Sequence, residues 1–275
     1  MGYLPLNVDN GTEIQSLEDY IERISELGNN KQNEDGTLYF RGQEADFWKI
    51  EPSVFRNDML SVEHTLILEP RRIIPGEFHG LINDFEILEK CQHYGMCTRL
   101  LDITSNPLVA LYFACAEHEE EEYEENGTVF SNKPNGVIYF REENSAIYSN
   151  DRRVKIILTL AKNDVTNLHI EDALCLLVND NVITSEQKEK WLSEDGIIEF
   201  VHTVQSVYTV LPVCSNERLV RQSGAFLLPG KFNLTVDGDD IKNGFISKSE
   251  ARLRDEFNNS FFYVLDENKE KHKLQ

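Results

Sequence analysis

The sequence predicts an α+β fold: a single compact domain in which a mixed, mainly antiparallel sheet packs against helices. Segments with helical and with strand periodicity follow one another without the regular strand–helix–strand order of a parallel sheet. Of the 275 residues, 40% are hydrophobic, which is enough to bury a substantial core. No internal repeat and no linker-like stretch divides the chain, so we expect one domain.

The N-terminal part is expected to contribute one helix and one strand. Ser16 is a good capping residue for a helix over residues 16–28, and Gly28 ends its apolar stripe. Residues 37–43 follow a polar loop and are expected to form a strand that ends in Arg-Gly-Gln. Prolines within residues 44–76 argue against long elements there.

The next part is expected to hold two helices joined by a polar loop. Helical spacing of apolar residues extends over 77–94 and stops at Gly95. After a loop over 96–105, the Asn-Pro pair at 106–107 provides a capping residue and a first-turn proline for the second helix. That helix leads into the acidic run 117–125, which we expect to be a solvated tip or a flexible loop.

The rest of the chain mixes both kinds of element. Strands are expected over residues 136–141, 155–161, 200–211, 225–228 and 261–265. Helices are expected over residues 169–179 and 184–194, as an inserted hairpin, and over residues 247–257. Capping boxes at Thr184 with Gln187 and at Ser247 with Glu250 support two of these helices.

Charge and composition argue against several classes of function. With 27 basic and 48 acidic side chains the net charge is −21, which disfavours long nucleic acids and anionic lipid surfaces. We expect no membrane association, because no apolar run is long enough to span a bilayer and the first residues do not resemble a secretory signal. Five scattered cysteines without a CxxC pair indicate free thiols in a reducing cytoplasm.

The common catalytic motifs are absent from the sequence. It contains no P-loop, no Rossmann glycine pattern, no GxSxG turn and no HExxH helix. Cys91, His93 and Cys97 are three potential metal ligands close together, but a structural zinc site requires four. We therefore expect no metal.

The strand end Arg41-Gly42-Gln43 is the first candidate binding segment. An arginine binds a phosphate or carboxylate through two parallel hydrogen bonds, and a neighbouring glycine lets the backbone come close to a ligand. The alternative is that Arg41 belongs to a buried structural ion pair.

The stretch from Gln92 to Pro107 is the second candidate, because it gathers many hydrogen-bonding side chains between two largely apolar helices. Polar loops held by rigid elements often form binding sites. The alternative is a structural loop in which Arg99 pairs with Asp102, while Thr104 and Asn106 cap the next helix.

These segments resemble the FRG domain family. The similar blocks are Tyr39-Phe-Arg-Gly-Gln43, Gln92-His-Tyr-Gly with Thr98-Arg-Leu-Leu-Asp102, Asn106 to Ala114, and a later block from Arg218 to Phe226. Cys97 stands where the family usually has proline. The resemblance implies an N-terminal helical segment over residues 1–36, an FRG domain over 37–266 with an insertion at about 165–195, and a frayed tail over 267–275.

The strand that ends in Arg-Gly is also similar, more distantly, to the opening motif of the arginine-type ADP-ribosyltransferases, where the arginine holds NAD. This resemblance implies an ADP-ribosyltransferase-like fold and an NAD-dependent toxin or anti-phage defence effector. It implies catalytic roles for Asp102 and Gln222, since no late Glu-x-Glu pair precedes a strand as in those transferases. It implies cofactor binding by Arg41, Gly42, Gln43, Gln92, His93, Tyr94, Thr98 and Arg99.

Two other functions stay open. One is a non-catalytic module that senses a nucleotide or another anion, and the other is a nucleic-acid-processing enzyme, which the net charge disfavours. The expected ligand is a small anionic nucleotide in a cleft made locally basic by Arg41, Arg99, Arg218 and Arg221. A transfer reaction would add a protein or nucleic-acid acceptor, and a toxin would add a neutralising partner protein.

Overall fold

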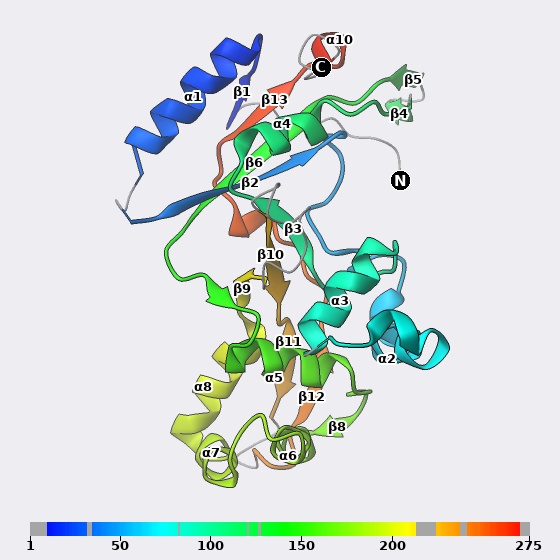
Figure 1. Cartoon of the computed structure of the whole chain (residues 1–275), viewed down its shortest axis with the longest axis vertical. Helices are drawn as coiled ribbons and strands as arrows, with labels where there is room; N and C mark the ends of the chain where they lie inside the picture. Colours follow the sequence, from blue (N-terminus) through cyan, green and yellow to red (C-terminus); the bar gives the residue numbers. More distant parts are fainter. Residues whose placement is uncertain are drawn as a thin grey trace.

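The computed structural model describes residues 10–31, 35–81, 83–119, 121–125, 128–212, 224–236 and 241–269; of residues 121–125 and 128–132 it describes the backbone alone. A mixed eight-stranded sheet forms its centre. In Figure 1, α1 and α4 lie beside the upper strands of this sheet, and α5 to α8 form the lower part of the molecule. Together these elements make one α+β fold, as predicted.

The large sheet is mixed but mainly antiparallel. In spatial order its strands are β1 (Gly11–Glu13), β13 (Phe261–Val264), β6 (Gly136–Glu143), β2 (Thr37–Gln43), β3 (Leu101–Thr104), β10 (Gly224–Pro229), β9 (Val207–Leu211) and β7 (Ile147–Tyr148). The outer pairs β1–β13 and β7–β9 are parallel, and the pairs between them are antiparallel.

Two smaller sheets and a set of helices complete the described part. The smaller sheets consist of β11 (Phe232–Thr235), β12 (Phe245–Lys248) and β8 (Leu168–His169), and of β4 (Glu121–Glu125) with β5 (Thr128–Asn132). The helices are α1 (Leu17–Asn29), α2 (Glu63–Ile73), α3 (Asp84–His93), α4 (Pro107–Ala114), α5 (Arg152–Ala161), α6 (Ile170–Asn179), α7 (Ser185–Trp191), α8 (Glu194–Gln205) and α10 (Asp266–Lys269). None of the helices in the described ranges is long and apolar enough to cross a membrane.

The core is divided by the large sheet. On one face of β13, β6 and β2, the helices α1 and α4 bury Tyr20, Ala110 and Leu111 against Phe40 of β2. The opposite face is covered by the irregular segments around Ile50 and Leu253, which pack on Tyr39 and Ile103. The helices α5 to α8 enclose a third cluster with β9 and β10. The strands β2, β3 and β10 therefore lie where the clusters meet.

Several predicted elements are confirmed with nearly their predicted ends. Ser16 accepts a hydrogen bond from the Asp19 amide and begins α1. Asn106 caps α4 through the Leu108 amide, and Thr184 caps α7 through the Gln187 amide. The strands β2, β10 and β13 match expected strands. These elements were predictable because their caps and their periodicity are local.

Other predictions were wrong because an apolar run does not distinguish a strand from a buried helix. Residues 155–161 form most of α5, a helix that is buried almost all round. The expected strand over 200–211 is instead the end of α8 followed by β9. The helix expected over 247–257 had a different cause, the capping box at Ser247, and it is reduced to a 3-10 turn at Arg254–Glu256 because Ser247 of β12 pairs with Asn233 of β11.

Short elements account for the remaining differences. The predicted loop over 96–105 contains β3, and the acidic run at 117–125 ends in a strand of the β4–β5 hairpin. The helix predicted from residue 77 begins at Asp84, because Asn83 caps it. The expected frayed tail begins with α10, where Lys269 is buried and donates a 2.7 Å hydrogen bond to the carbonyl of Glu44.

Candidate functional site

The large sheet opens between β2 and β3. Strand β2 pairs with β6 along its whole length, but it pairs with β3 only where Phe40 faces Thr104. Beyond that pair, Nη1 of Arg41 donates a hydrogen bond of 2.9 Å to the backbone carbonyl of Asp102. The guanidinium thus joins the two strands where their ladder has ended.

A cavity of about 490 Å³ lies at this opening, a volume within the usual range of ligand sites. Strand β2 and the loop after it, α3, β3, α4 and β10 all contribute to its wall. The polar side chains that line it belong to Arg41, Gln43, Glu44, Glu89, Gln92, His93, Asp102 and Thr104, and the aromatic ones to Phe40, Trp48, Phe113 and Phe226. Both candidate segments of the sequence therefore meet at one cavity.

Gly42 is required by helix packing. A Cβ atom added to Gly42 would lie 1.8 Å from the carbonyl oxygen of Ala110, so only glycine lets α4 lie this close to β2. Close approach of the backbone was predicted, but the partner that the structure brings to Gly42 is α4.

Arg41 lies half-buried on the face of β2 opposite to Gly42, because side chains alternate along a strand. Its Nε is buried and has no hydrogen-bond partner among the described residues. Burial lowers the pKa of the guanidinium, and the charge of Asp102 opposes that shift. A buried donor without a partner is a group that a bound acceptor would satisfy.

Asp102 is held in place by a short chain of side-chain hydrogen bonds. Nε2 of Gln92 donates to its carboxylate, and Oε1 of Gln92 accepts a 2.7 Å hydrogen bond from the hydroxyl of Thr98. Thr98 is buried and is not part of the cavity wall. Its place in the site is therefore to fix Gln92, and through Gln92 the carboxylate of Asp102.

Glu89 of α3 is a site residue that sequence reasoning missed. It belongs to the buried face of an otherwise largely apolar helix stripe, yet it lines the cavity. Burial, together with the negative charges of Glu86 and Asp102, raises the pKa of Glu89 to about 7. The available signal was a carboxylate within an apolar helix stripe. Burying a carboxylate costs free energy, and residues buried at that cost are often functional.

His93 and Tyr94 differ although they are neighbours. His93 lines the cavity, and its Nε2 lies 3.8 Å from Oε1 of Glu89. Tyr94 does not line it: its ring is largely exposed, and its hydroxyl donates a 2.6 Å hydrogen bond to Glu77. The structure therefore does not bring Tyr94 to the other candidate residues.

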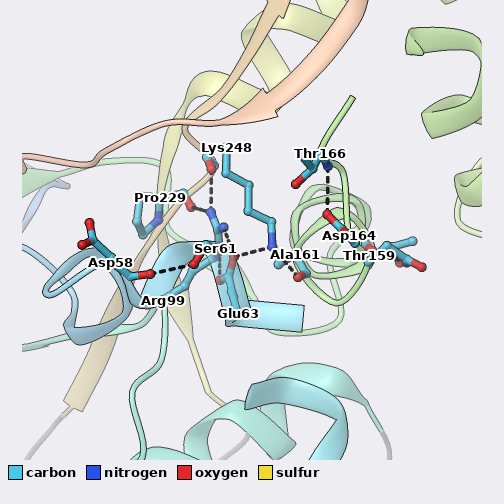
Figure 2. A network of polar contacts seen from close by, with 12 residues as sticks. Asp58, Ser61, Glu63, Arg99, Thr159, Ala161, Asp164, Thr166, Pro229 and Lys248 are labelled. Atoms are coloured by element: carbon cyan, nitrogen blue, oxygen red, sulfur yellow. Dashed lines mark hydrogen bonds and ion pairs between the residues drawn. The ribbon is translucent and has the colours of Figure 1, made fainter. Parts of the chain in front are cut away.

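Arg99 is also kept apart from the cavity. It is completely buried and forms a two-point ion pair with Glu63 of α2, at 2.6 Å from Nε to Oε1 and 2.5 Å from Nη2 to Oε2. Nη1 donates to the carbonyls of Pro229 and Gly230. Figure 2 shows this network, in which Lys248 of β12 also contacts Glu63, at 3.0 Å. The pairing of Arg99 with Asp102 that the sequence suggested is wrong.

The last two candidate residues are Gln43 and Gln222. Gln43 is almost fully buried, lines the cavity, and has no hydrogen-bond partner for either amide atom among the described residues. Gln222 lies outside the described residues, as do Arg218 and Arg221.

The described part of the cavity is more acidic than the sequence suggested. Its wall carries the carboxylates of Glu44, Glu89 and Asp102 against the guanidinium of Arg41 and the imidazole of His93. The predicted basic cleft depended partly on Arg99, whose charge is neutralised elsewhere by Glu63. The cavity is therefore suited to a ligand that carries positive as well as negative charge.

The fold and the cavity define a class of protein: an α+β domain with a cavity that opens in the central sheet beside an Arg-Gly strand end. Residues 36–123 match the family model of the FRG domain. That range contains β2, α3, β3 and α4, which supply most of the cavity wall. The chain thus carries an FRG domain. Comparison with curated proteins and with solved structures gave no match.

Proposed function

We propose that the protein binds NAD in this cavity and cleaves it to transfer ADP-ribose, as an ADP-ribosyltransferase-like enzyme. The observation that carries the proposal is the meeting of Arg41 with the carboxylates of Glu89 and Asp102 at one cavity. An arginine at a strand end suits the phosphates of a dinucleotide, and carboxylates suit the carbon that becomes positive during cleavage.

The charge of the wall supports NAD over a simple polyphosphate. The carboxylates of Glu44 and Asp102, joined by Glu89 once it ionises, would repel a ligand that carries phosphates alone. NAD joins its phosphates to a nicotinamide ring that bears a positive charge. Trp48 and Phe113 offer aromatic surface for such a flat cation.

The geometry also suits the chemistry of cleavage. Loss of nicotinamide from ribose passes through a state that resembles an oxocarbenium ion, and a fixed negative charge nearby stabilises it. Gln92 and Thr98 fix the Asp102 carboxylate, so little reorganisation is needed when the charge develops. Continuous loss of NAD would arrest a cell, which agrees with a toxin or anti-phage effector controlled by a neutralising partner.

The first prediction tests this proposal on the full chain. Incubation with NAD is expected to release nicotinamide, measured by chromatography, and Arg41→Ala is expected to lower the rate at least about 100-fold. Asp102→Asn is expected to lower it similarly while keeping the Arg41 contact, because Arg41 binds the backbone carbonyl of residue 102. Arg153→Ala, at an exposed ion pair with Asp151, is the matched control.

Two results would contradict the proposal. One is release that Arg41→Ala and Asp102→Asn leave unchanged in folded protein. The other is no release by the unaltered protein, tested with and without a cell extract as a source of acceptors. If NAD then still raised the melting temperature, the non-catalytic nucleotide-sensing module would be favoured.

A further inference from the structure

We propose that Glu89 is the general base of the cavity, which accepts the proton of the water or acceptor hydroxyl that attacks the ribose. Asp102 then serves as the fixed charge that faces the ribose. This inference rests on the proposed cleavage of NAD, and it assigns a role to a residue outside the motifs that identify the family.

The position of Glu89 is the first support. It lies on the face of α3 that turns to the cavity, it is 7% exposed, and it shares the cavity wall with Asp102. A general base needs access to the reacting group together with shelter from bulk water, and a buried residue at a cavity wall has both.

The charged groups around Glu89 come from three elements. Its own helix contributes Glu86 one turn before it and His93 one turn after it. Strand β3 contributes Asp102, and Arg41 and Glu44 at the end of β2 line the same cavity. In the described part of the wall, α4 and β10 contribute no titratable side chain.

The two carboxylates have different surroundings. The Asp102 carboxylate accepts a hydrogen bond from Gln92 and belongs to a residue that is largely exposed. Glu89 is buried between acidic neighbours, which raises its pKa to about 7. Carboxyl groups whose environments differ in this way divide the roles of charge stabiliser and proton carrier in many enzymes.

The step that follows is balanced in atoms and charge. The bond between ribose C1′ and the nicotinamide nitrogen breaks, and its electron pair leaves on nicotinamide, which becomes neutral. The oxygen of water or of the acceptor hydroxyl forms the new bond to C1′. Its proton passes to the Glu89 carboxylate and from there to solvent.

The second prediction concerns the pH dependence of this step. Only ionised Glu89 accepts a proton, so the rate is expected to rise about tenfold per pH unit below 7 and to level off above it. Glu89→Gln, which keeps the shape and removes the base, is expected to lose about 10²- to 10⁴-fold and to flatten the profile.

Glu86→Gln provides a matched variant on the same helix. Glu86 does not line the cavity, but its charge contributes to the raised pKa of Glu89. This variant is expected to keep the rate at high pH and to move the midpoint of the profile to lower pH, because a repelling charge is removed. A Glu89 with a merely structural role would give no such shift.

A readout independent of activity separates the two proposals. Infrared titration of the full chain is expected to show a protonated carboxyl that is lost between pH 6 and 8, absent in Glu89→Gln and moved to lower pH in Asp102→Asn. If that carboxyl titrates as expected but NAD is not cleaved, the proposed function and the base role that rests on it both fail.

Opposite results overturn the assignment of Glu89 alone. If NAD is cleaved and depends on Arg41, while folded Glu89→Gln keeps both the rate and the pH profile, Glu89 is not the base. If no carboxyl removed by Glu89→Gln titrates between pH 6 and 8, the assignment fails in the same way.

Discussion

Arg41 and Arg99 both lie within the family match, but Arg41 lines the cavity whereas Arg99 is completely buried away from it. Arg41 reaches into the opening of the sheet with a buried Nε that has no hydrogen-bond partner among the described residues. Arg99 is saturated by Glu63 and by two backbone carbonyls, and it packs against the rings of Phe55 and Phe232. The partners of Arg99 give it a structural role, whereas the surroundings of Arg41 suit the ligand contact that we propose.

The third prediction follows from the burial of the ion pair between Arg99 and Glu63. Burial alone would raise the pKa of Glu63, but Arg99 and Lys248 together hold it below its usual value. Arg99→Met would leave Glu63 with Lys248 as its remaining charged partner, so a loss of about 3 kcal/mol in the free energy of unfolding is expected. Denaturant titration measures this loss.

The control for Arg99→Met is Arg153→Met, which breaks an exposed ion pair with Asp151. That change is expected to cost less than about 1 kcal/mol, since exposed pairs contribute little. Equal losses in the two variants would refute the structural role given to Arg99.

At the scale of elements, the closeness of α4 to β2 and β6 shapes the cavity. Gly42 of β2 lies under the carbonyl of Ala110, and Gly136 of β6 lies under that of Ala114. These two contacts allow the helix to rest directly on the sheet, which places Val109 and Phe113 at the cavity wall. The position of α4 therefore depends on glycine at both strands.

The fourth prediction concerns Gly42→Ala. The added Cβ would meet the backbone of Ala110, which has no free rotamer to adopt, so the helix must move at a cost of about 1–3 kcal/mol. The variant should also weaken NAD binding. Gly28→Ala in α1 meets nothing within 4 Å and is expected to be neutral or slightly stabilising. Thermal melting of both variants compares them, and an unchanged Gly42→Ala would contradict the packing argument.

At the scale of the whole molecule, the net charge is −21, and the described wall of the cavity is also acidic. The net charge repels a long polyanion, while a small ligand interacts mainly with the groups around it. We therefore expect the overall charge to disfavour long polyanions, while the local groups of the cavity determine which small ligand fits.

The fifth prediction is that the protein does not bind long nucleic acids without sequence preference. At about 0.15 M salt, gel-shift titration with duplex DNA and with single-stranded RNA is expected to show no complex at micromolar protein. A complex that weakens steeply as salt is raised would contradict this and would favour the nucleic-acid-processing alternative.

Much of the fold was predictable because its signals are local. The caps at Ser16, Asn106 and Thr184 and the strand Thr37–Gln43 require only neighbours in the sequence. The run 155–161 forms a helix rather than the predicted strand, because a nearly continuous buried apolar run does not distinguish the two.

The sequence by itself determined the class of fold, the family resemblance and the two candidate segments, which the structure then brings to one cavity. Only the tertiary structure decided the roles within them. It paired Arg99 with Glu63, 36 residues away, and it turned Glu89 of α3 toward Asp102 of β3. The reason is physical: burial and charge at a residue depend on what packs against it from distant parts of the chain.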